Sequence, residues 1–430
     1  MDIINWQDLN DAERQACLQR PAQESESSVH DIVVDIIANV KKRGDEALRE
    51  YAHKLDKCPD NNLKLTTEEI KQACERIDPT LKEAIDQAYK NISHFHAAQE
   101  PCHVKVETVS GIECQTATHP IEKVGLYVPG GSAPLVSTAL MLGVPAQIAK
   151  CEQVVLTSPY PLSDGIIYAA TKCGIKDIFK LGGAHAVAAL AYGTESVPKV
   201  HKIFGPGNQF VTMAKRLVSD DPNGAAIDMP AGPSEVLVIA DEHADADFVA
   251  ADLHSQAEHG PDSQVILVSP STQLLEQTQV ALEKQLNCLP RKEIALKAFS
   301  KSRLIKTQDL QEAIEISNTY APEHLIVQID DPHAIVAKLR NAGSIFLGAY
   351  TCESMGDYAS GTNHTLPTYG YAKTASALGT DDFRRRYTIS CASAQGLRNI
   401  GHTVEVLASA EGLDAHRNAV TLRLAKIGCN

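Results

Sequence analysis

The stretch KVGLYVPGGSAPLVSTALMLGVPAQIAKCEQVVLTSP (123–159) decides the fold of this chain. It begins with a mostly apolar run of strand type (123–129), passes through the loop PGGSAP (129–134), and continues as an apolar helix from about Leu135 to Lys150. A second strand, QVVLTSP, closes the stretch. A strand, a helix and a strand at this spacing predict a βαβ unit in a parallel sheet.

The same alternation continues to about residue 348. Strands are predicted at 177–181, 202–205, 235–241, 264–270, 303–306, 324–329 and 343–348. Helices are predicted near 165–173, after Gly183, from Asn208, up to His259, and within 272–299, 308–319 and 333–340. Parallel strands need crossover connections, and these are right-handed. The pattern therefore predicts an α/β fold with two parallel sheets joined around residue 235.

The two ends of the chain lack this alternation. Residues 1–100 are mainly helical in pattern and carry no catalytic motif, so we interpret them as scaffold. After about Ala377 a charged stretch, DDFRRR (381–386), precedes three predicted helical runs and no strand. About fifty helical residues cannot build a large core alone, so this tail is expected to dock on its own chain or on a partner.

Composition narrows the class of protein. A chain of 430 residues is longer than one hydrophobic core usually supports, which predicts two or more domains. The formal net charge of −14 argues against a nucleic acid or an anionic membrane surface as a partner. The first residues lack a signal-peptide pattern, and no apolar run reaches the ~18 residues of a membrane span. Eleven cysteines without a CxxC pair argue against a secreted disulfide framework, so a cytoplasmic protein is expected.

A candidate metal site lies in AADLHSQAEHG (250–260), at the end of a predicted helix. Gln256 and His259 are three residues apart, so their side chains lie on one face, about one turn apart. An amide oxygen and an imidazole placed in this way can bind one divalent metal. Zinc takes about four ligands and this helix offers at most two, so a solvated helix end is the alternative on this stretch alone.

Two glycine-containing loops follow predicted strands of the first half. PGGS (129–132) and GPGN (205–208) each precede a helix, whose N-terminus suits an anionic group. In such sheets ligands bind at the carboxyl ends of the strands. The chain has no GxGxxG fingerprint, so nucleotide binding and a tight turn without a ligand are equally fair interpretations of each loop.

A pair of acid–base side chains stands at the start of a predicted strand. In YAPEH (320–324), Glu323 and His324 adjoin each other and could both transfer protons. They can serve one site only if the turn at Pro322 breaks the alternation of the strand. A solvated Glu beside a strand-capping His is the alternative.

Further polar side chains lie downstream. The loop SMGDYASGTNHTLPTYGYA (354–372) carries Asp357 and His364. It is too long for a plain connection, which indicates a functional or disordered loop. The last predicted helix starts near Leu413 and carries His416.

Seven strings together resemble the L-histidinol dehydrogenase family. They are GLYVPGGSAPL (125–135), FGPGN (204–208), IDMPAGPSEVLVIAD (227–241), ADLHSQAEH (251–259), YAPEHL (320–325), GDYASGTNHTLPT (356–368) and EGLDAH (411–416). The matches run in the family's order from about residue 30 to the C-terminus. The resemblance implies two incomplete Rossmann-like domains, small helical terminal segments and an intertwined homodimer.

The resemblance also implies a division of the chain. Residues 1–21 would form an N-terminal helical segment. Residues 22–126 and 236–377 would form a first Rossmann-like domain that carries the metal and catalytic residues. Residues 127–235 would form a second Rossmann-like domain on the cofactor side, and 378–430 a C-terminal helical segment for dimerisation.

The family oxidises L-histidinol to L-histidine through L-histidinaldehyde, in the last steps of histidine biosynthesis, with two NAD and one zinc per subunit. The resemblance implies that Gln256, His259, Asp357 and His416 bind the zinc. These mixed donors suit zinc and would also accept manganese or cobalt. The zinc would hold the substrate in place rather than activate its hydroxyl.

The resemblance further implies which residues act on the substrate and the cofactor. His324 would remove the proton as hydride leaves, and Glu323 would activate water on the aldehyde. The implied substrate contacts are Ser234, Gln256, His259, His324, Asp357, His364, Glu411 and His416. The implied cofactor contacts are Tyr127, His185 and Asn208. In the family, Glu411 and His416 come from the neighbouring subunit, which accounts for a helical tail without its own core.

The sequence departs from the family pattern at several positions. His185 stands where the family usually has Gln at a cofactor contact, and Cys352 replaces a usual Pro. Gly260 replaces a usual Asp, and His254 a usual apolar residue. His254 lies ~160–200° around the helix from Gln256, so it is expected to face away from the metal.

Two other functions remain open from the sequence. One is a related zinc- and NAD-dependent dehydrogenase of another small alcohol, such as a sulfonated diol. The other is a non-catalytic regulator that binds a metal and a nucleotide. Intact Glu323, His324, His364 and Glu411 favour histidinol, since a change of substrate or the loss of catalysis would alter these contacts first.

Overall fold

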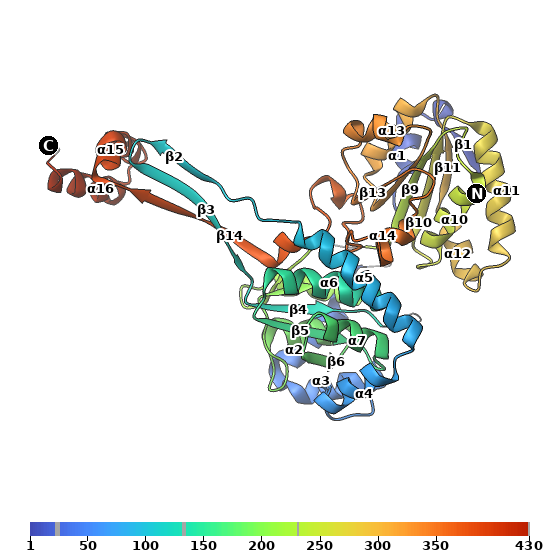
Figure 1. The fold of residues 1–430 in the computed structure, drawn as a ribbon, viewed down its shortest axis with the longest axis horizontal. Helices are drawn as coiled ribbons and strands as arrows, with labels where there is room; N and C mark the ends of the chain where they lie inside the picture. Colours follow the sequence, from blue (N-terminus) through green and yellow to red (C-terminus); the bar gives the residue numbers. More distant parts are fainter. Residues whose placement is uncertain (22–25, 131–134, 230–231, 429–430) are drawn as a thin grey trace.

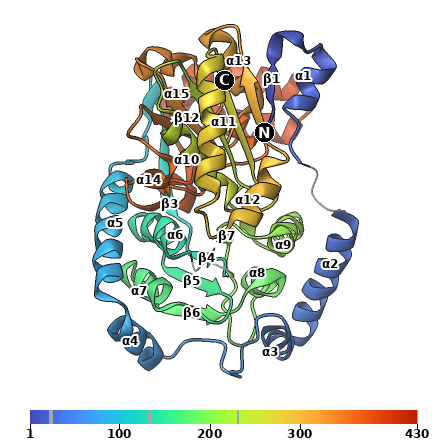
Figure 2. The same ribbon diagram turned by 90° about the vertical axis from the view of Figure 1, so that its right-hand side faces the viewer.

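The computed structural model describes residues 1–21, 26–130, 135–229 and 232–428. They form two α/β lobes, each built on a parallel sheet, and a long arm that projects from one of them (Figures 1 and 2). The predicted α/β fold with two parallel sheets is confirmed. None of the helices in these ranges is long and apolar enough to cross a membrane.

The first lobe contains a six-stranded parallel sheet in the order β1-β11-β10-β9-β12-β13. Its strands are β1 (Ile3–Asn5), β9 (Glu235–Ala240), β10 (Gln264–Ser269), β11 (Arg303–Lys306), β12 (His324–Gln328) and β13 (Ser344–Leu347). Along β9, Val236 and Val238 face one core, whereas Leu237 and Ile239 face the other. Because both faces of the sheet are buried, its strands are near-continuous apolar runs.

Helices cover both faces of this sheet. On one face lie α10 (Ala246–Ala257), α11 (Thr272–Leu286) and α12 (Lys292–Phe299), and on the other α1 (Asp11–Cys17) and α13 (Leu310–Tyr320). The helix predicted at 333–340 is a 3-10 helix, η2 (Pro332–Lys338). The remaining short helices of the described residues are η1 (Trp6–Asp8), α14 (Glu353–Tyr358), η3 (Tyr371–Lys373) and η4 (Thr380–Phe383). Phe383 of η4 packs in the core of the second lobe, where its ring stacks on that of Phe204.

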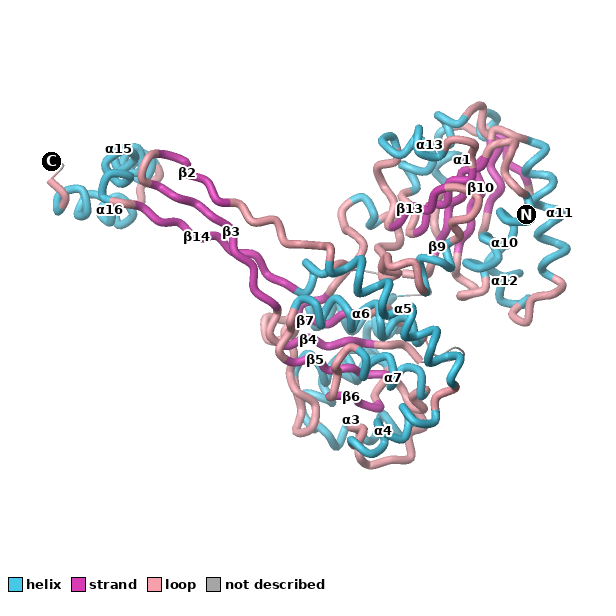
Figure 3. The backbone as a smooth tube through the Cα atoms, viewed as in Figure 1, coloured by secondary structure: helices cyan, strands magenta, loops and turns pink. Residues whose placement is uncertain are grey.

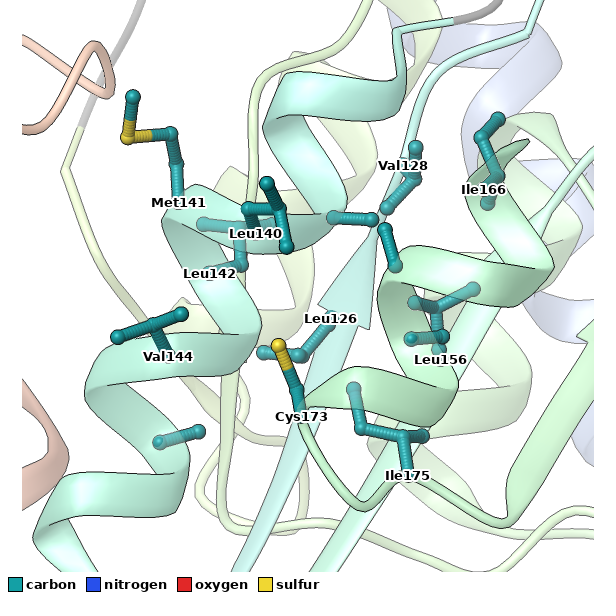
Figure 4. Close-up of a cluster of buried hydrophobic side chains, with 14 of the residues drawn as sticks. Leu126, Val128, Leu140, Met141, Leu142, Val144, Leu156, Ile166, Cys173 and Ile175 are labelled. Carbon is teal, nitrogen blue, oxygen red and sulfur yellow. The ribbon is translucent and has the colours of Figure 1, made fainter. Parts of the chain in front are cut away.

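The second lobe contains a five-stranded parallel sheet in the order β6-β5-β4-β7-β8. Its strands are β4 (Lys123–Tyr127), β5 (Gln153–Ser158), β6 (Asp177–Lys180), β7 (Lys202–Phe204) and β8 (Ala226–Ile227). On one face lie α4 (Thr67–Arg76), α5 (Pro79–Ala97), α6 (Val136–Ala149) and α7 (Asp164–Lys172). Figure 4 shows Leu126 and Leu156 of the sheet packed against Leu140 and Leu142 of α6.

The opposite face of the second sheet is covered by α2 (Glu26–Arg43), α3 (Asp45–Lys54), α8 (Gly183–Tyr192) and α9 (Gln209–Asp220). Residues 26–97 therefore pack on the second sheet, and the expected grouping of 22–126 with 236–377 differs from this packing. The apolar faces of these helices pack on the second sheet. Helical periodicity predicts that such a face is buried, but it does not identify the sheet that covers it. The expected boundary at residue 126 would also cut strand β4.

The N-terminal segment is not only helical. Strand β1 (Ile3–Asn5) pairs in parallel with β11 and extends the sheet of the first lobe. This strand has three residues, which is too short to give a periodic signal in the sequence. The segment 1–21 is thus part of the first lobe.

The arm is a three-stranded antiparallel sheet, β14-β3-β2, that carries two helices at its tip (Figures 1 and 3). Its strands are β2 (Lys105–Val109), β3 (Ile112–Pro120) and β14 (Arg384–Ala392), and its helices are α15 (Ala394–Ala410) and α16 (Asp414–Lys426). The expectation of three helices and no strand after residue 377 is wrong, because β14 pairs with β3 along its whole length. This strand is largely exposed, so it lacks the apolar alternation that marks a half-buried strand.

Candidate active site

A cavity of about 630 Å³ lies between the two sheets. The second lobe contributes the loop 206–209 and residues near the start of α6, such as Thr138. The first lobe contributes seven residues that were predicted as site residues from the sequence: Ser234, Gln256, His259, Glu323, His324, Asp357 and His364. Residues more than two hundred positions apart in the chain therefore meet in one cavity.

Glu323 and His324 lie together at the start of β12, and the turn before them explains how. Ala321 ends α13 in the left-handed conformation, with φ 56°, and the chain reverses direction there. The N–H of Glu235 donates to Glu323 Oε2 at 3.0 Å, and His324 Nδ1 donates to Glu235 O at 3.2 Å. The turn thus breaks the strand alternation, as one shared site requires.

The carbonyl of Glu235 favours one tautomer of the His324 ring. Because a carbonyl can only accept, this contact places the proton on Nδ1 and leaves Nε2 as an acceptor. Nε2 is buried, lies 3.5 Å from Asp357 Oδ1, and makes no hydrogen bond to any part of the chain that the structure describes. A neutral His324 in this position is a base with an available lone pair.

Oxygen and nitrogen donors for a cation gather beside this pair. Ligand atoms of His259, Glu353 and Asp357 all lie within 4.8 Å of one another. The contacts of Gln256 assign its amide nitrogen to the side that faces Glu353, 2.5 Å and 3.0 Å from the two carboxylate oxygens, and the same nitrogen lies 3.2 Å from His324 Nδ1. The reverse orientation would place the amide oxygen against these acceptors. The Gln256 oxygen is thus directed away from Glu353 and is free to bind a metal.

The electrostatics of the cluster favour a cation. Burial raises the pKa of both Glu323 and Glu353 to about 8. Burial would lower the pKa of His324, but the surrounding carboxylates raise it well above its usual value. Burial would raise the pKa of Asp357, but the neighbouring imidazole of His324, 3.5 Å away, holds it lower. Carboxylates this close together repel one another, and a bound cation would offset that repulsion.

His364 is fixed by two contacts at the edge of the cavity. Its Nδ1 lies 2.9 Å from the backbone oxygen of Asp357, and its Nε2 lies 3.2 Å from Thr138 Oγ1 of the second lobe. Burial lowers the pKa of His364, which keeps the ring neutral. This side chain therefore links the loop of the first lobe to the second lobe across the cavity.

Of the three implied cofactor contacts, Asn208 lines the cavity. It caps helix α9, since its Oδ1 accepts from the N–H groups of Phe210 and Val211. The other glycine loop, PGGS (129–132), lies partly outside the described residues, because 131–134 are not among them.

Tyr127 and His185 lie at the N-terminus of α8 and do not line this cavity. The Tyr127 hydroxyl accepts from the N–H of Gly183 at 3.1 Å. The ring of Tyr127 is buried in the core of the second lobe, so Tyr127 contacts the N-terminus of α8 through its hydroxyl. His185 is fully buried, with Nε2 3.0 Å from Asp56 Oδ2 and its ring stacked on Tyr51. The local sequence could not indicate Asp56, which lies 129 residues away.

A buried ion pair holds the loop that carries Asn208. Lys215 Nζ donates to Gly205 O at 2.8 Å and pairs with Asp228, while Asp228 Oδ2 accepts from Gly205 N at 2.7 Å. Gly205 has φ +117°, and a Cβ there would lie 2.1 Å from Tyr127 O. Only glycine fits at this position.

Glu411 and His416 are not brought to the cavity within this chain. Both are exposed in the arm, where the turn after α15 leads into α16. Figure 1 shows these helices at the far end of the arm, well away from α10 and α14. Their implied place in the site therefore requires a second subunit.

Some residues around the site carried no clear signal in the sequence. Glu353 precedes Asp357 by four positions on α14, so the two share a helix face, and this spacing could have indicated it. Glu235 acts through its backbone, which no motif reveals. His254, as expected, faces away: its Nε2 lies 3.0 Å from Leu282 O.

Comparison with known proteins agrees with this geometry. The sequence profile of the family described as "Histidinol dehydrogenase" matches residues 18–424. Histidinol dehydrogenase of Mannheimia succiniciproducens is 56% identical over 427 residues, which cover 99% of this chain and 100% of that protein. The Shigella sonnei protein of the same name is 57% identical, over 98% of this chain and 97% of that protein.

A solved structure gives the same result. The crystal structure of histidinol dehydrogenase from Elizabethkingia anophelis superposes with a TM-score of 0.96 at 45% identity, covering 99% of this chain and 98% of that chain. The fold and these relatives define an α/β oxidoreductase, and the candidate site is the cavity between its two parallel sheets. The chain belongs to the histidinol dehydrogenase family.

Proposed function

We propose that this chain oxidises L-histidinol to L-histidine through L-histidinaldehyde, in a reaction that depends on zinc and NAD. The observation that supports this most directly is the meeting of Glu323 and His324 with the donors Gln256, His259 and Asp357 in one cavity. The first lobe would carry metal binding and proton transfer. The second lobe would bind the cofactor.

The donor set fits a zinc ion. Gln256, His259 and Asp357 supply amide oxygen, imidazole nitrogen and carboxylate oxygen, and His416 of the partner subunit would be the fourth ligand. A zinc ion held by these residues would serve to position the substrate, so that its carbinol carbon lies beside the proton-transfer residues. His364 and Ser234 line the same cavity and would contact the substrate, together with Glu411 of the partner subunit.

His324 would act as the general base in both oxidations. Its Nε2 is the atom left without a hydrogen bond in the described chain, and the Glu235 carbonyl holds its Nδ1 proton. Nε2 would take the hydroxyl proton of the alcohol, and later that of the aldehyde hydrate, as hydride leaves the carbon. The charge of a bound cation would favour the neutral ring, against the carboxylates that raise the His324 pKa.

Glu323 would activate the water that adds to the aldehyde. Its carboxylate has one oxygen bound by the N–H of Glu235, which leaves the other to accept a proton from water. Burial raises the pKa of Glu323 to about 8, which makes it a stronger base than an exposed carboxylate. The hydrate formed in this step is the substrate of the second oxidation.

The cofactor would lie against the second lobe. NAD would supply the hydride acceptor for each of the two oxidations. The loop 205–208 leads into the N-terminus of α9, whose dipole favours an anionic group such as a phosphate, and Asn208 is placed at the cavity. Tyr127 and His185 do not line the cavity, and they would support the cofactor site indirectly, through the N-terminus of α8.

A homodimer would complete each site. The arm exposes many large apolar side chains: Val104, Val106, Val109, Ile389, Val406, Leu407, Leu413 and Leu422. Apolar surface on this scale marks a protein interface. An arm that reaches a second copy of the chain would bury these side chains and deliver Glu411 and His416 of each subunit to the site of the other.

The reaction is tested by its stoichiometry. Zinc-loaded protein given L-histidinol and excess NAD is expected to produce two NADH for each histidinol consumed, because two hydrides leave one carbon. NADH is measured by absorbance and histidine by chromatography. One NADH per substrate would indicate an ordinary alcohol dehydrogenase, and none would indicate a binding protein.

The metal is tested by removing one ligand. His259→Ala is expected to lose most of its zinc on dialysis, since a site with three remaining ligands binds zinc much more weakly. Metal analysis of the dialysed protein measures the loss. His254→Gln is the matched control on the preceding helix α10, because His254 faces Leu282 and this variant should retain one zinc per chain. Full zinc retention by His259→Ala would contradict the assignment.

A further inference from the structure

We propose that Arg20 is a positioning residue that holds Glu323 and His324 in their catalytic geometry. The inference rests on the proposed roles of these two residues. Arg20 lies in the N-terminal segment, about three hundred positions before them in the chain, and it does not line the cavity. It contacts both chain segments that place the pair.

The first of these segments is the start of β9. Arg20 Nε lies 2.6 Å from Glu235 Oε2 and Nη2 lies 2.8 Å from Oε1, so the two side chains form a bidentate ion pair. The Glu235 side chain is 2% exposed, and Tyr320 OH also donates to it at 3.1 Å. This side chain is therefore held from two directions, and the backbone of the same residue is held with it.

The backbone of Glu235 contacts both catalytic side chains. Its N–H donates to Glu323 Oε2 at 3.0 Å, and its carbonyl accepts from His324 Nδ1 at 3.2 Å. A shift of this one residue would misplace the carboxylate and the imidazole together. It would also loosen the hydrogen bond that keeps His324 Nε2 free to act as a base.

The second segment is the turn between α13 and β12. Arg20 Nη2 also donates to Tyr320 O at 2.8 Å and to Ala321 O at 3.2 Å, which are carbonyls at the C-terminus of α13. The guanidinium carbon lies 4.0 Å from the centre of the Tyr320 ring. Ala321 has a left-handed backbone, a conformation that persists for a non-glycine residue only where its surroundings enforce it.

The guanidinium of Arg20 thus connects the two chain segments that position Glu323 and His324. A guanidinium has five N–H donors in a fixed fork, so Arg20 can bind a carboxylate on one edge and carbonyls on another. A lysine has one charged atom and cannot reach both segments in the same geometry. The role is specific to arginine, and this distinguishes positioning from simple charge balance.

The chain contains a matched control. Arg14, in the same N-terminal segment, donates to Trp6 O at 3.3 Å and 3.2 Å and lies 5.4 Å from the centre of the Trp6 ring. It makes no contact with Glu235 or with the turn. Arg14→Met weakens the docking of the N-terminal segment. Arg20→Met weakens this docking too, and it also removes the contacts with Glu235 and with the turn before β12.

The experiment compares Arg20→Met, Arg20→Lys and Arg14→Met in the zinc-loaded protein. Arg20→Met is expected to lower kcat about 10²-fold, because displacements of about 1 Å at a reacting group cost that much. KM for histidinol and zinc content should remain near the wild-type values, since the zinc ligands are untouched. Arg20→Lys should recover part of the loss, and Arg14→Met should keep kcat within about twofold at a similar loss of melting temperature.

Several outcomes would overturn the proposal. One is a kcat loss in Arg20→Met no larger than in Arg14→Met at equal melting temperature, and another is a loss that follows zinc content. If Arg20→Met does not fold, Arg20→Lys carries the test, and unchanged kcat in that variant contradicts the role. A failure of the proposed reaction is recognised separately, because the wild-type protein would then not produce two NADH per histidinol.

Discussion

Glutamine in place of Glu323 is expected to slow the oxidation of L-histidinaldehyde by about 10²–10⁴-fold and to affect the oxidation of L-histidinol far less. The substitution keeps the size of the side chain and its hydrogen bond with the N–H of Glu235. It removes the base that activates water, which only the second oxidation needs. Separate assays that start from the alcohol and from the aldehyde measure the two rates.

His324→Ala provides the contrast, because this base would serve both oxidations and both rates should fall together. Glu315→Gln on the exposed face of α13 is the control for a change of charge near this segment, and it should leave both rates unchanged. If Glu323→Gln slowed the two oxidations equally, the division of roles between Glu323 and His324 would be wrong.

A mixture of two inactive variants, His416→Ala and His259→Ala, is expected to regain activity when the proteins are unfolded and refolded together. If His416 crosses to the partner, each mixed dimer holds one site with both defects and one site with neither. Random pairing makes about half of the dimers mixed, so about a quarter of the wild-type activity should return. The NADH rate before and after mixing measures it.

The control for this experiment is His402→Ala, which changes another exposed histidine of the arm, on α15. On its own it should remain active, which shows that the arm tolerates the loss of an imidazole elsewhere. Mixed dimers demonstrated by differently tagged chains, but without recovered activity, would mean that each site is built from a single chain.

Much of the fold is visible in the sequence because its two parallel sheets are buried on both faces. Strands such as β9 and β10 are uninterrupted apolar runs, and each is followed by a helix with its own periodicity. The elements that escaped prediction lack this signal. Strand β1 has three residues, and β14 is largely exposed in the arm, so neither shows a buried pattern.

The grouping of elements depends on packing rather than on pattern. Helices α2 to α5 precede the second sheet in the chain and pack on its two faces. Their amphipathic stripes would suit either sheet equally well. Only the three-dimensional arrangement decides which apolar face each helix covers, because hydrophobic burial is not directional.

The site follows the same division. The α/β class and the family could be inferred from the sequence alone, and short local motifs predicted the site residues Gln256, His259, Glu323, His324 and Asp357. The contacts that position these side chains became visible only in the three-dimensional structure. Glu235 positions Glu323 and His324 through its backbone, and Arg20 reaches it from 215 residues away. These contacts join residues that are far apart in the sequence, and they depend on how the strands and turns pack in three dimensions. A local sequence motif therefore cannot predict them.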